Sequence, residues 1–192
     1  LQARFWVENL NAAVLFAVTL VLASVLPVKV EARYAAIVVE SESGQVLFSR
    51  NANSALYPAS LTKMMTLYLA FEALGARSIS LEQRLSVSRR AAGQTPSKLG
   101  LRAGQMIAVE DAIIAVVAKS ANDAATVLAE TLAKSEVEFA KLMTKKAREI
   151  GMQRTTFRNA TGLPNRRQRS TARDMARLAQ ALLRDYPEYY HY

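Results

Sequence analysis

Residues 57–75 read YPASLTKMMTLYLAFEALG, and the rest of the chain is best interpreted outward from this stretch. Ser60 and Lys63 are three residues apart where an extended segment is expected to become a helix, so both side chains should project from one face of the first turn. The apolar residues that follow predict a helix buried on more than one side. The stretch therefore combines a nucleophile with a neighbouring base.

Lys63 is the candidate base for Ser60, because the chain offers few other neighbours that could take its proton. Its only histidine is His191 and it contains no cysteine, which argues against a Ser-His-Asp triad. Lysine accepts a proton only when neutral, and lowering its pKa from about 10.4 to about 7 requires roughly 4 to 5 kcal/mol. Burial and the positive end of a helix dipole both act in that direction. At the same helix start, the backbone N–H of Ser60 is expected to be a free donor suited to an oxyanion hole.

A plain structural interpretation competes with this chemistry. Serine is a preferred helix N-cap, so Ser60 could cap the helix while Lys63 solvates its first turn. The pattern Ser-x-x-Lys is also expected about once by chance in a chain of this length and average composition. The remaining sequence has to decide between the two.

The first 32 residues are organised differently from the rest. Residues 12–26 are almost wholly apolar, and the segment that follows ends in the small-x-small pattern of Val30 and Ala32. We predict an export signal at residues 1–32, cleaved after Ala32. A retained membrane anchor is the alternative, because the apolar run is nearly long enough to span a bilayer.

The formal net charge of the chain is +9. The charges of Arg4, Glu8, Lys29 and Glu31 cancel, so the part after the predicted signal carries the whole excess. This balance predicts an anionic partner, which outside the cytoplasmic membrane means wall polymers or lipid headgroups rather than nucleic acid.

The remaining pattern predicts strands first and helices later. Two β-branched or alternating runs around a polar turn predict a hairpin, and apolar periodicity with capping boxes at Ser135 and Thr171 predicts helices. The exposed-looking loop 93–105 is interpreted as a surface connection, with the rim of a groove as the alternative. The expected strands are 34–40, 45–50 and 85–88. The helix that starts at Ser60 is expected to end near Leu74, with Gly75 as the C′ residue, and the other expected helices are 109–117, 123–133, 135–150 and 171–184.

A short polar junction separates two of these helices. It contains Ser120, which offers a donor and an acceptor, and Asn122, whose amide can bind a peptide carbonyl and an N–H together. The alternative is a plain N-cap for the second helix. Later in the chain, Arg166, Arg167 and Arg169 form either an anion-binding patch or a solvated basic loop, and the solvated loop is favoured.

Several stretches together resemble one family. PASLTKMMT at residues 58–66, KSANDAA at 119–125, NATGLP at 159–164 and STARDM at 170–175 are similar, in this order, to motifs of the serine D-alanyl-D-alanine carboxypeptidases, the low-molecular-mass penicillin-binding proteins. The similarity covers roughly residues 34–190. The family also includes β-lactamase relatives, but no Glu-x-x-Leu-Asn segment follows Asn122, so a carboxypeptidase is favoured over a β-lactamase.

The resemblance implies an α+β, transpeptidase-like fold, in which an antiparallel sheet packed with helices lies beside a mainly helical region and the site lies between them. It implies that Ser60 is acylated by the penultimate D-alanine carbonyl, Lys63 accepts the proton, Ser120 relays a proton to the leaving group and Asn122 holds the substrate amide. It implies no metal or other cofactor. The implied partners are peptidoglycan stem peptides ending in D-Ala-D-Ala and β-lactams as covalent inhibitors, at the extracytoplasmic face of the bacterial membrane or in the periplasm.

One departure from the family is plain. Its third motif, Lys-Thr-Gly, is absent before Tyr192. We therefore expect residues 33–192 to be the N-terminal part of a carboxypeptidase domain that lacks its C-terminal strands and any membrane-associating C-terminal segment, and we expect these 192 residues alone to be weak or inactive catalysts. The alternative is a non-catalytic peptidoglycan-binding protein of the same fold.

Overall fold

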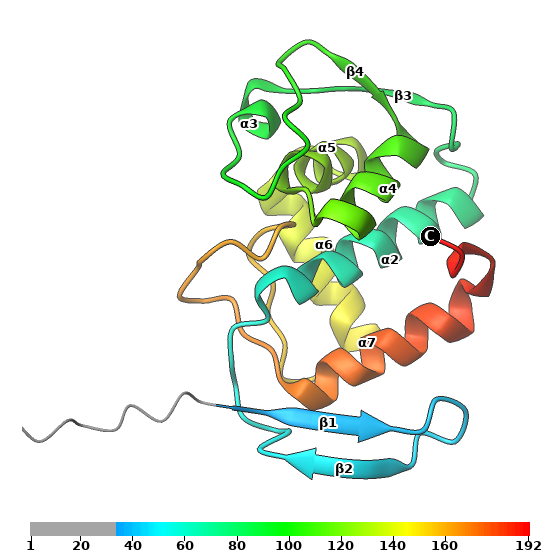
Figure 1. Cartoon of the computed structure of the whole chain (residues 1–192), viewed down its shortest axis with the longest axis vertical. Coiled ribbons are helices and arrows are strands. Elements are labelled where there is room, and N and C mark those ends of the chain that lie inside the picture. The colour runs from blue at the N-terminus through cyan, green and yellow to red at the C-terminus, as the bar shows by residue number, and fades with distance from the viewer. Residues whose placement is uncertain (1–33) are drawn as a thin grey trace, which may run out of the picture. The chain divides into compact units, whose positions relative to one another are not determined.

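The helix that follows the serine turn, α2 (Thr62–Gly75), runs through the middle of the computed structural model, which describes residues 34–192. It contacts α4 (Val109–Lys119), α5 (Asn122–Leu132), α6 (Glu136–Glu149) and α7 (Ala172–Asp185) (Figure 1). The prediction of a helix buried on more than one side is confirmed. No helix within the described range is long and apolar enough to cross a membrane. The predicted export signal at residues 1–32 lies outside the described residues.

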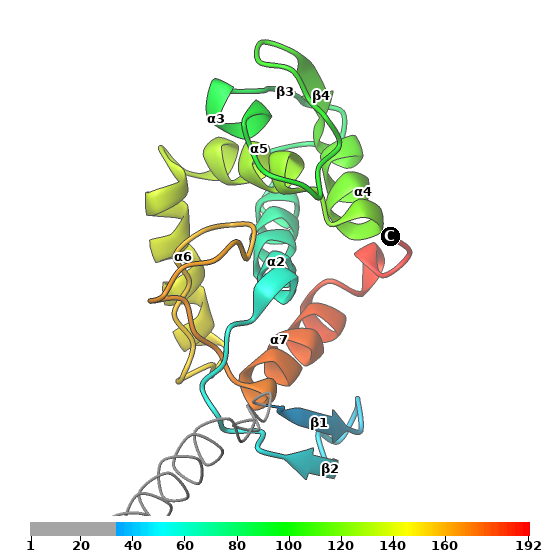
Figure 2. The same ribbon diagram turned by 60° about the vertical axis from the view of Figure 1, so that its left-hand side comes forward.

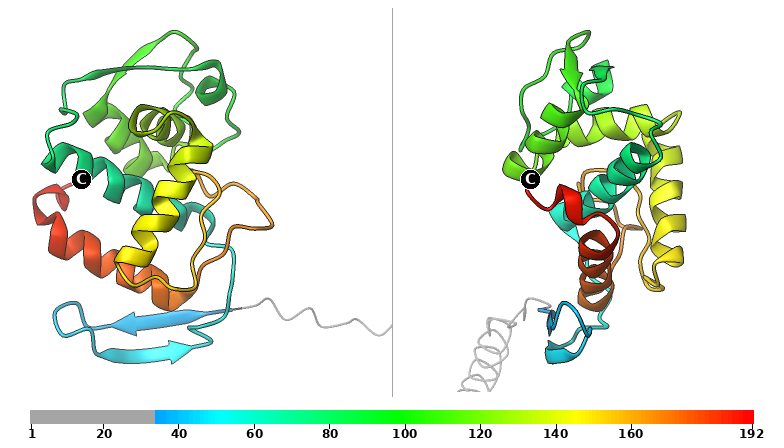
Figure 3. Two further views of the ribbon diagram at one scale, coloured as in Figure 1. Left: turned by 180° about the vertical axis from the view of Figure 1, so that it is seen from behind. Right: turned by 90° about the vertical axis from the view of Figure 1, so that its right-hand side faces the viewer.

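Two apolar cores share α2. Its first half packs into one core with α6, α7 and the loop between them, and its second half packs into the other with α4 and α5 (Figures 2 and 3). Burying one large apolar side chain completely, such as Leu, Met or Phe, stabilises the fold by about 1.5 to 3 kcal/mol. The residues that fix the first core are Met65, Tyr68, Phe139, Met143, Phe157 and Leu178, and those that fix the second are Phe71, Leu74, Ile113, Val116 and Leu128.

The predicted N-terminal hairpin is confirmed. Strands β1 (Ala36–Val39) and β2 (Val46–Arg50) pair antiparallel, and β1 lies along α7. The carboxylate of Glu40 closes the turn by accepting from the N–H of Ser43 at 2.5 Å and from its hydroxyl at 2.6 Å. β2 is exposed along its whole length.

A second small sheet forms above α4 and α5. It pairs β3 (Arg84–Ser86) with β4 (Met106–Ala108). The expected strand at residues 85–88 is present but ends at Ser86, because the Ser88 hydroxyl accepts from the Ala91 N–H at 2.9 Å and caps the short helix α3 (Arg89–Ala92). Sequence analysis did not predict β4 or α3, since three or four residues are too few to show a periodicity.

The predicted N-caps of α6 and α7 are confirmed, but within residues 34–192 neither predicted capping box is complete, because the carboxylates of Glu138 and Asp174 bind other partners. The Ser135 hydroxyl accepts from the Glu138 N–H at 3.2 Å, and the Thr171 hydroxyl accepts from the Asp174 N–H at 3.1 Å, so α6 and α7 begin where expected. The predicted end of α2 is wrong by a residue or two. Gly75 is its last helical residue, and the left-handed conformation that follows a helix is taken by Arg77 at φ 54°.

The loop between α6 and α7 crosses the start of α2 with almost no space between them. Gly162 adopts φ +86°, and a Cβ built on it would lie 1.9 Å from the carbonyl oxygen of Ala59. A side chain at this position is therefore excluded twice, by the backbone conformation and by the backbone of the serine turn.

We expect Gly162→Ala to lower the free energy of unfolding by about 3 kcal/mol or more. Left-handed strain contributes about 1 to 2 kcal/mol, and displacing the crowded backbone contributes about 1 to 3 kcal/mol. Gly100→Ala is the matched control, because Gly100 also has a positive φ, +93°, but an added Cβ meets nothing within 4 Å. Urea denaturation measures both variants, and equal losses would show that the close approach to Ala59 has no energetic weight.

Candidate active site

Ser60 lies in a single 3-10 turn, η1 (Ala59–Leu61), that leads directly into α2. Its side chain is exposed, and the residue before it, Ala59, has φ 47°, a conformation that costs energy for a non-glycine residue. Within residues 34–192 neither the hydroxyl nor the backbone N–H of Ser60 has a hydrogen-bond partner. The N-cap interpretation is wrong, because Leu61 occupies that position and no side chain caps α2. Ser60 thus presents both a nucleophile and a free donor.

Lys63 is buried in the first turn of α2, with 4% of its surface exposed. Its Nζ donates a hydrogen bond of 2.6 Å to the carbonyl oxygen of Thr161. Burial lowers the pKa of Lys63 from 10.5 to about 8, which makes the neutral amine accessible near neutral pH. The interpretation of Lys63 as a solvated surface residue is therefore wrong.

The loop that receives Lys63 is bound to α2 at further points. The Thr66 hydroxyl donates to the carbonyl oxygen of Ala160 at 2.8 Å. Buried Gln168 accepts from the N–H of Asn159 at 3.2 Å, and its side-chain nitrogen donates to the Thr62 hydroxyl at 3.3 Å. The sequence marks this stretch only through the family resemblance, and no role was predicted for these residues. The signal that could have found them is Gly162 in a loop otherwise rich in hydrogen-bonding side chains.

The second predicted motif lies at the junction of α4 and α5. Ser120 takes the left-handed conformation that ends α4, with φ 53° and ψ 38°, and is half-buried. Asn122 is the first residue of α5, and its amide nitrogen donates to the Thr95 carbonyl at 2.8 Å. The N-cap interpretation is wrong here too, because Ala121 is the N-cap and no side chain caps α5. Asn122 keeps a second amide hydrogen and its carbonyl oxygen for another partner.

Asp123 fixes the loop that runs past this junction. Burial raises the pKa of its carboxyl, but hydrogen bonds from the backbone N–H groups of Leu99, Gly100, Leu101 and Ala124 outweigh burial, so that the pKa is lowered overall. The loop 93–105 is largely exposed, as expected of a surface connection. Its backbone is nevertheless held against the Ser120–Asp123 junction, because the N–H of Asn122 donates to the Ser97 carbonyl at 2.8 Å.

The two motifs belong to one packed unit, because α2 contacts both α4 and α5. Among the described residues, however, no hydrogen bond joins the side chains of Ser60, Lys63, Ser120 and Asn122. The fold therefore places a serine beside a buried lysine at one helix start and a serine beside an amide at a second junction. The joint action of the four side chains stays a prediction.

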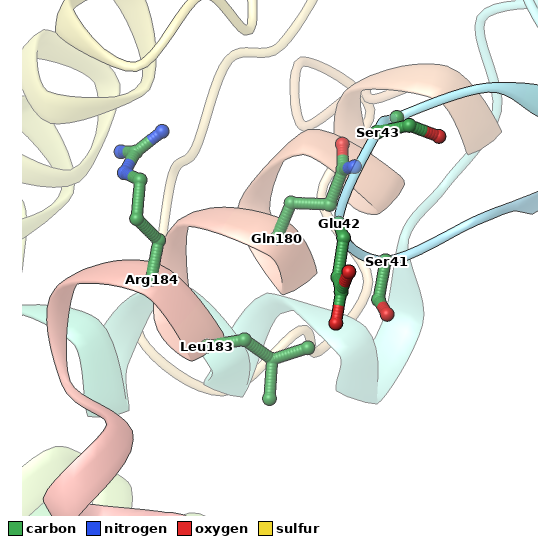
Figure 4. Close-up of a pocket in the computed structure, with 7 residues that line it drawn as sticks. Ser41, Glu42, Ser43, Gln180, Leu183 and Arg184 are labelled. Atoms are coloured by element: carbon green, nitrogen blue, oxygen red, sulfur yellow. The ribbon is translucent and has the colours of Figure 1, made fainter.

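A hollow of about 460 Å³ lies beside the serine turn. It is lined by Tyr57, Ala59, Gly162, Leu163, Pro164, Asn165, Arg166 and Gln168. Of the three loop arginines, Arg166 and Arg167 are exposed, whereas the guanidinium of Arg169 stacks 3.5 Å above the ring of Tyr57. A larger hollow of about 580 Å³, between the β1–β2 turn and α7, contains none of the four predicted site residues (Figure 4).

Known proteins are similar to this chain over most of its length. The family model for D-alanyl-D-alanine carboxypeptidase, peptidase S11, matches residues 22–192. D-alanyl-D-alanine carboxypeptidase DacF of Bacillus subtilis is 39% identical over 149 residues, which cover 78% of this chain and 38% of that protein.

Solved structures give the same result. The D-alanyl-D-alanine carboxypeptidase DacD of Francisella tularensis superposes with a TM-score of 0.79 at 33% identity, over 85% of this chain and 40% of that one. Penicillin-binding protein D2 of Listeria monocytogenes in its cefotaxime-bound form superposes with a TM-score of 0.71 at 32% identity, over 80% of this chain and 63% of that one. The fold is that of the penicillin-binding proteins, and the chain belongs to the family of D-alanyl-D-alanine carboxypeptidases.

Proposed function

We propose that the protein to which this chain belongs is a serine-type D-Ala-D-Ala carboxypeptidase that removes the terminal D-alanine of peptidoglycan stem peptides. The observation that carries the proposal is the pairing of exposed Ser60 with buried Lys63 at the start of α2. Membership of the D-alanyl-D-alanine carboxypeptidase family supports a catalytic role for these two residues. The chain spans 38% of the Bacillus subtilis relative, so the proposal concerns a protein of which these residues form one part.

In the proposed reaction Ser60 Oγ attacks the carbonyl carbon of the penultimate D-alanine. Lys63, as the neutral amine, takes the hydroxyl proton, and the backbone N–H of Ser60 binds the developing oxyanion. As the C–N bond breaks, Ser120 relays the proton held by Lys63 to the departing D-alanine nitrogen, while Asn122 holds the substrate amide through its remaining donor and acceptor. Water then attacks the Ser60 ester and releases the shortened peptide.

The proposed partners and location follow from the same substrate. The stem peptides are wall components, so we propose that residues 33–192 act outside the cytoplasmic membrane after export directed by residues 1–32. β-Lactams would be covalent inhibitors, because their strained amide presents a carbonyl to Ser60 in place of the peptide; the Listeria relative was solved with cefotaxime bound. The net charge of +9 supports an anionic wall polymer as the surface on which the protein works.

Covalent labelling at Ser60 tests the proposed chemistry. A chimera carries residues 1–192 followed by the C-terminal remainder of the Bacillus subtilis relative, so that it reaches the relatives' length. We expect a fluorescent penicillin to label this chimera at Ser60, as located by peptide mass spectrometry, and to label the 192 residues alone a hundred- to a thousandfold more slowly. The family resemblance implies that the strand with the Lys-Thr-Gly motif supplies the second oxyanion donor, and losing one such donor typically has an effect of this size.

Two serine variants control this experiment. Ser60→Ala removes the proposed nucleophile, whereas Ser54→Ala changes an exposed serine six positions earlier. Labelling that survives Ser60→Ala, or that disappears equally in Ser54→Ala, would refute Ser60 as the nucleophile. Efficient labelling of the 192 residues alone would show that the later part of the relatives is dispensable for acylation.

The pH dependence of labelling tests the role of Lys63. Its pKa is lowered, so the neutral base appears as pH rises through about 8 instead of 10.5. We expect the labelling rate of the chimera to rise with pH, to level off above about 8.5, and to be about a hundredfold lower at pH 6 than on the plateau, following the neutral fraction.

Conservative lysine variants identify the group that titrates. Lys63→Arg leaves a side chain that stays charged and should abolish labelling, whereas Lys145→Arg alters an exposed lysine and should leave the profile unchanged. A profile that is flat between pH 6 and 9, or one that survives Lys63→Arg, would remove Lys63 as the base.

A non-catalytic wall-binding protein is the second candidate, favoured by the net charge of +9 and by exposed Arg166 and Arg167 beside the serine turn. We expect the chain to sediment with purified peptidoglycan and to be released by salt, which screens charge over a few ångströms at about 1 M. Arg166→Glu with Arg167→Glu should weaken sedimentation, and Arg77→Glu, an exposed arginine elsewhere, serves as the control. Binding without any penicillin labelling of the chimera would favour this candidate.

A further inference from the structure

Glu136, the first residue of α6, is a buried carboxylate with 4% of its surface exposed. Its Oε2 accepts from the Nε of Arg90 at 2.9 Å and forms an ion pair with the same guanidinium. Its Oε1 accepts from the backbone N–H of Ala160 at 3.1 Å. The dipole of α6 favours a carboxylate in its first turn without any partner outside the helix. The Oε1 of Glu136 nevertheless binds a partner in the loop between α6 and α7. One side chain thus connects two elements to that loop.

The loop residue held by Glu136 is also held from the opposite side. The N–H of Ala160 is bound by Glu136 of α6, and its carbonyl oxygen accepts from Thr66 of α2 at 2.8 Å. The next carbonyl oxygen along the chain, that of Thr161, is the acceptor for Lys63 at 2.6 Å. Both ends of the residue before the lysine acceptor are therefore fixed. These two bonds hold the Thr161 carbonyl in place together with the Asn159 side chain, which accepts from the N–H groups of Thr161 and Gly162.

We propose that Glu136 is a positioning residue for the base: through the N–H of Ala160 it sets the Thr161 carbonyl against Lys63 and keeps water away from the amine. The catalytic part of this role rests on the proposed carboxypeptidase function. The effect of Glu136 on the Ala160 N–H and on the pKa of Lys63 can be measured without any turnover.

A purely structural role makes a different prediction. If Glu136 served only to join α3 to α6, the bond to Arg90 would be its essential contact. Arg90 is 61% exposed and can follow a shortened partner or turn to solvent, whereas the Ala160 N–H is fixed in the backbone. Glu136→Asp keeps the charge for Arg90 but withdraws the acceptor from Ala160. Glu136→Gln keeps an acceptor for Ala160 but loses the charge for Arg90.

Two measurements on the 192-residue chain separate the roles. Amide hydrogen exchange at Ala160 reports the bond to Glu136, and an NMR titration of lysines labelled with ¹³C at Cε reports Lys63, whose signal is identified by its loss in Lys63→Arg. We expect Glu136→Asp to speed exchange at Ala160 by about tenfold or more and to raise the pKa of Lys63 by about one pH unit from its value of about 8, as water returns to the amine. We expect Glu136→Gln to leave both close to the wild type.

Two further variants guard the interpretation. Glu138→Asp makes the same shortening in the same helical turn, at an exposed carboxylate paired with Lys141, and should change neither measurement. Thr66→Val removes the opposite tether of Ala160 while keeping the side-chain volume, and should raise the pKa of Lys63 even if Glu136→Asp does not fold.

The proposal is overturned by either of two results. One is a Lys63 that titrates as in the wild type in folded Glu136→Asp or, if that variant does not fold, in Thr66→Val. The other is a Glu136→Gln that raises the pKa of Lys63 as much as Glu136→Asp does. Failure of the penicillin labelling described above would refute the carboxypeptidase proposal and leave these measurements unaffected.

Discussion

The burial of Lys63 against the loop between α6 and α7 is the constraint on which the candidate site depends. An amine with 4% of its surface exposed needs a polar partner, and here the partner is a backbone carbonyl, that of Thr161. A carbonyl has no charge that would hold the proton on the amine, so burial is opposed only by one hydrogen bond. Partnership with a carboxylate would have raised the pKa instead. A neutral acceptor thus leaves the pKa of Lys63 low, as the proposed role of base requires.

This constraint explains why the loop is fastened so firmly. Gly162 lets the loop approach the Ala59 carbonyl, Gln168 joins it to Thr62, and Thr66 and Glu136 hold the residue before Thr161. These contacts come from η1, α2 and α6, so the loop becomes part of the packing around α2. The serine turn and Lys63 are consequently supported by the same segment, although that segment contributes no side chain predicted to react.

Much of the fold was predictable because its signals are local. The hairpin turn and the N-caps at Ser135 and Thr171 depend on residues three or four positions apart, and the structure confirms them. The support of Lys63 was not predictable from the residues alone, because its acceptor lies 98 positions away in the sequence. The conformation of Ser120 was missed for another reason. A left-handed φ is uncommon for serine, and tertiary packing overrides that preference here.

The buried lysine also connects proton binding to folding. Lys63 has a lower pKa in the folded chain, about 8, than the ordinary value of 10.5 that it regains on unfolding. Between these two pH values the unfolded chain binds more protons, so this residue makes the fold more stable as pH rises through that window and least stable below it. At neutral pH the chain therefore folds against the cost of enclosing an ammonium group. The fold therefore loses free energy at Lys63 to keep the low pKa that the proposed base needs. Such a loss is the usual trade-off between the stability of a fold and its activity.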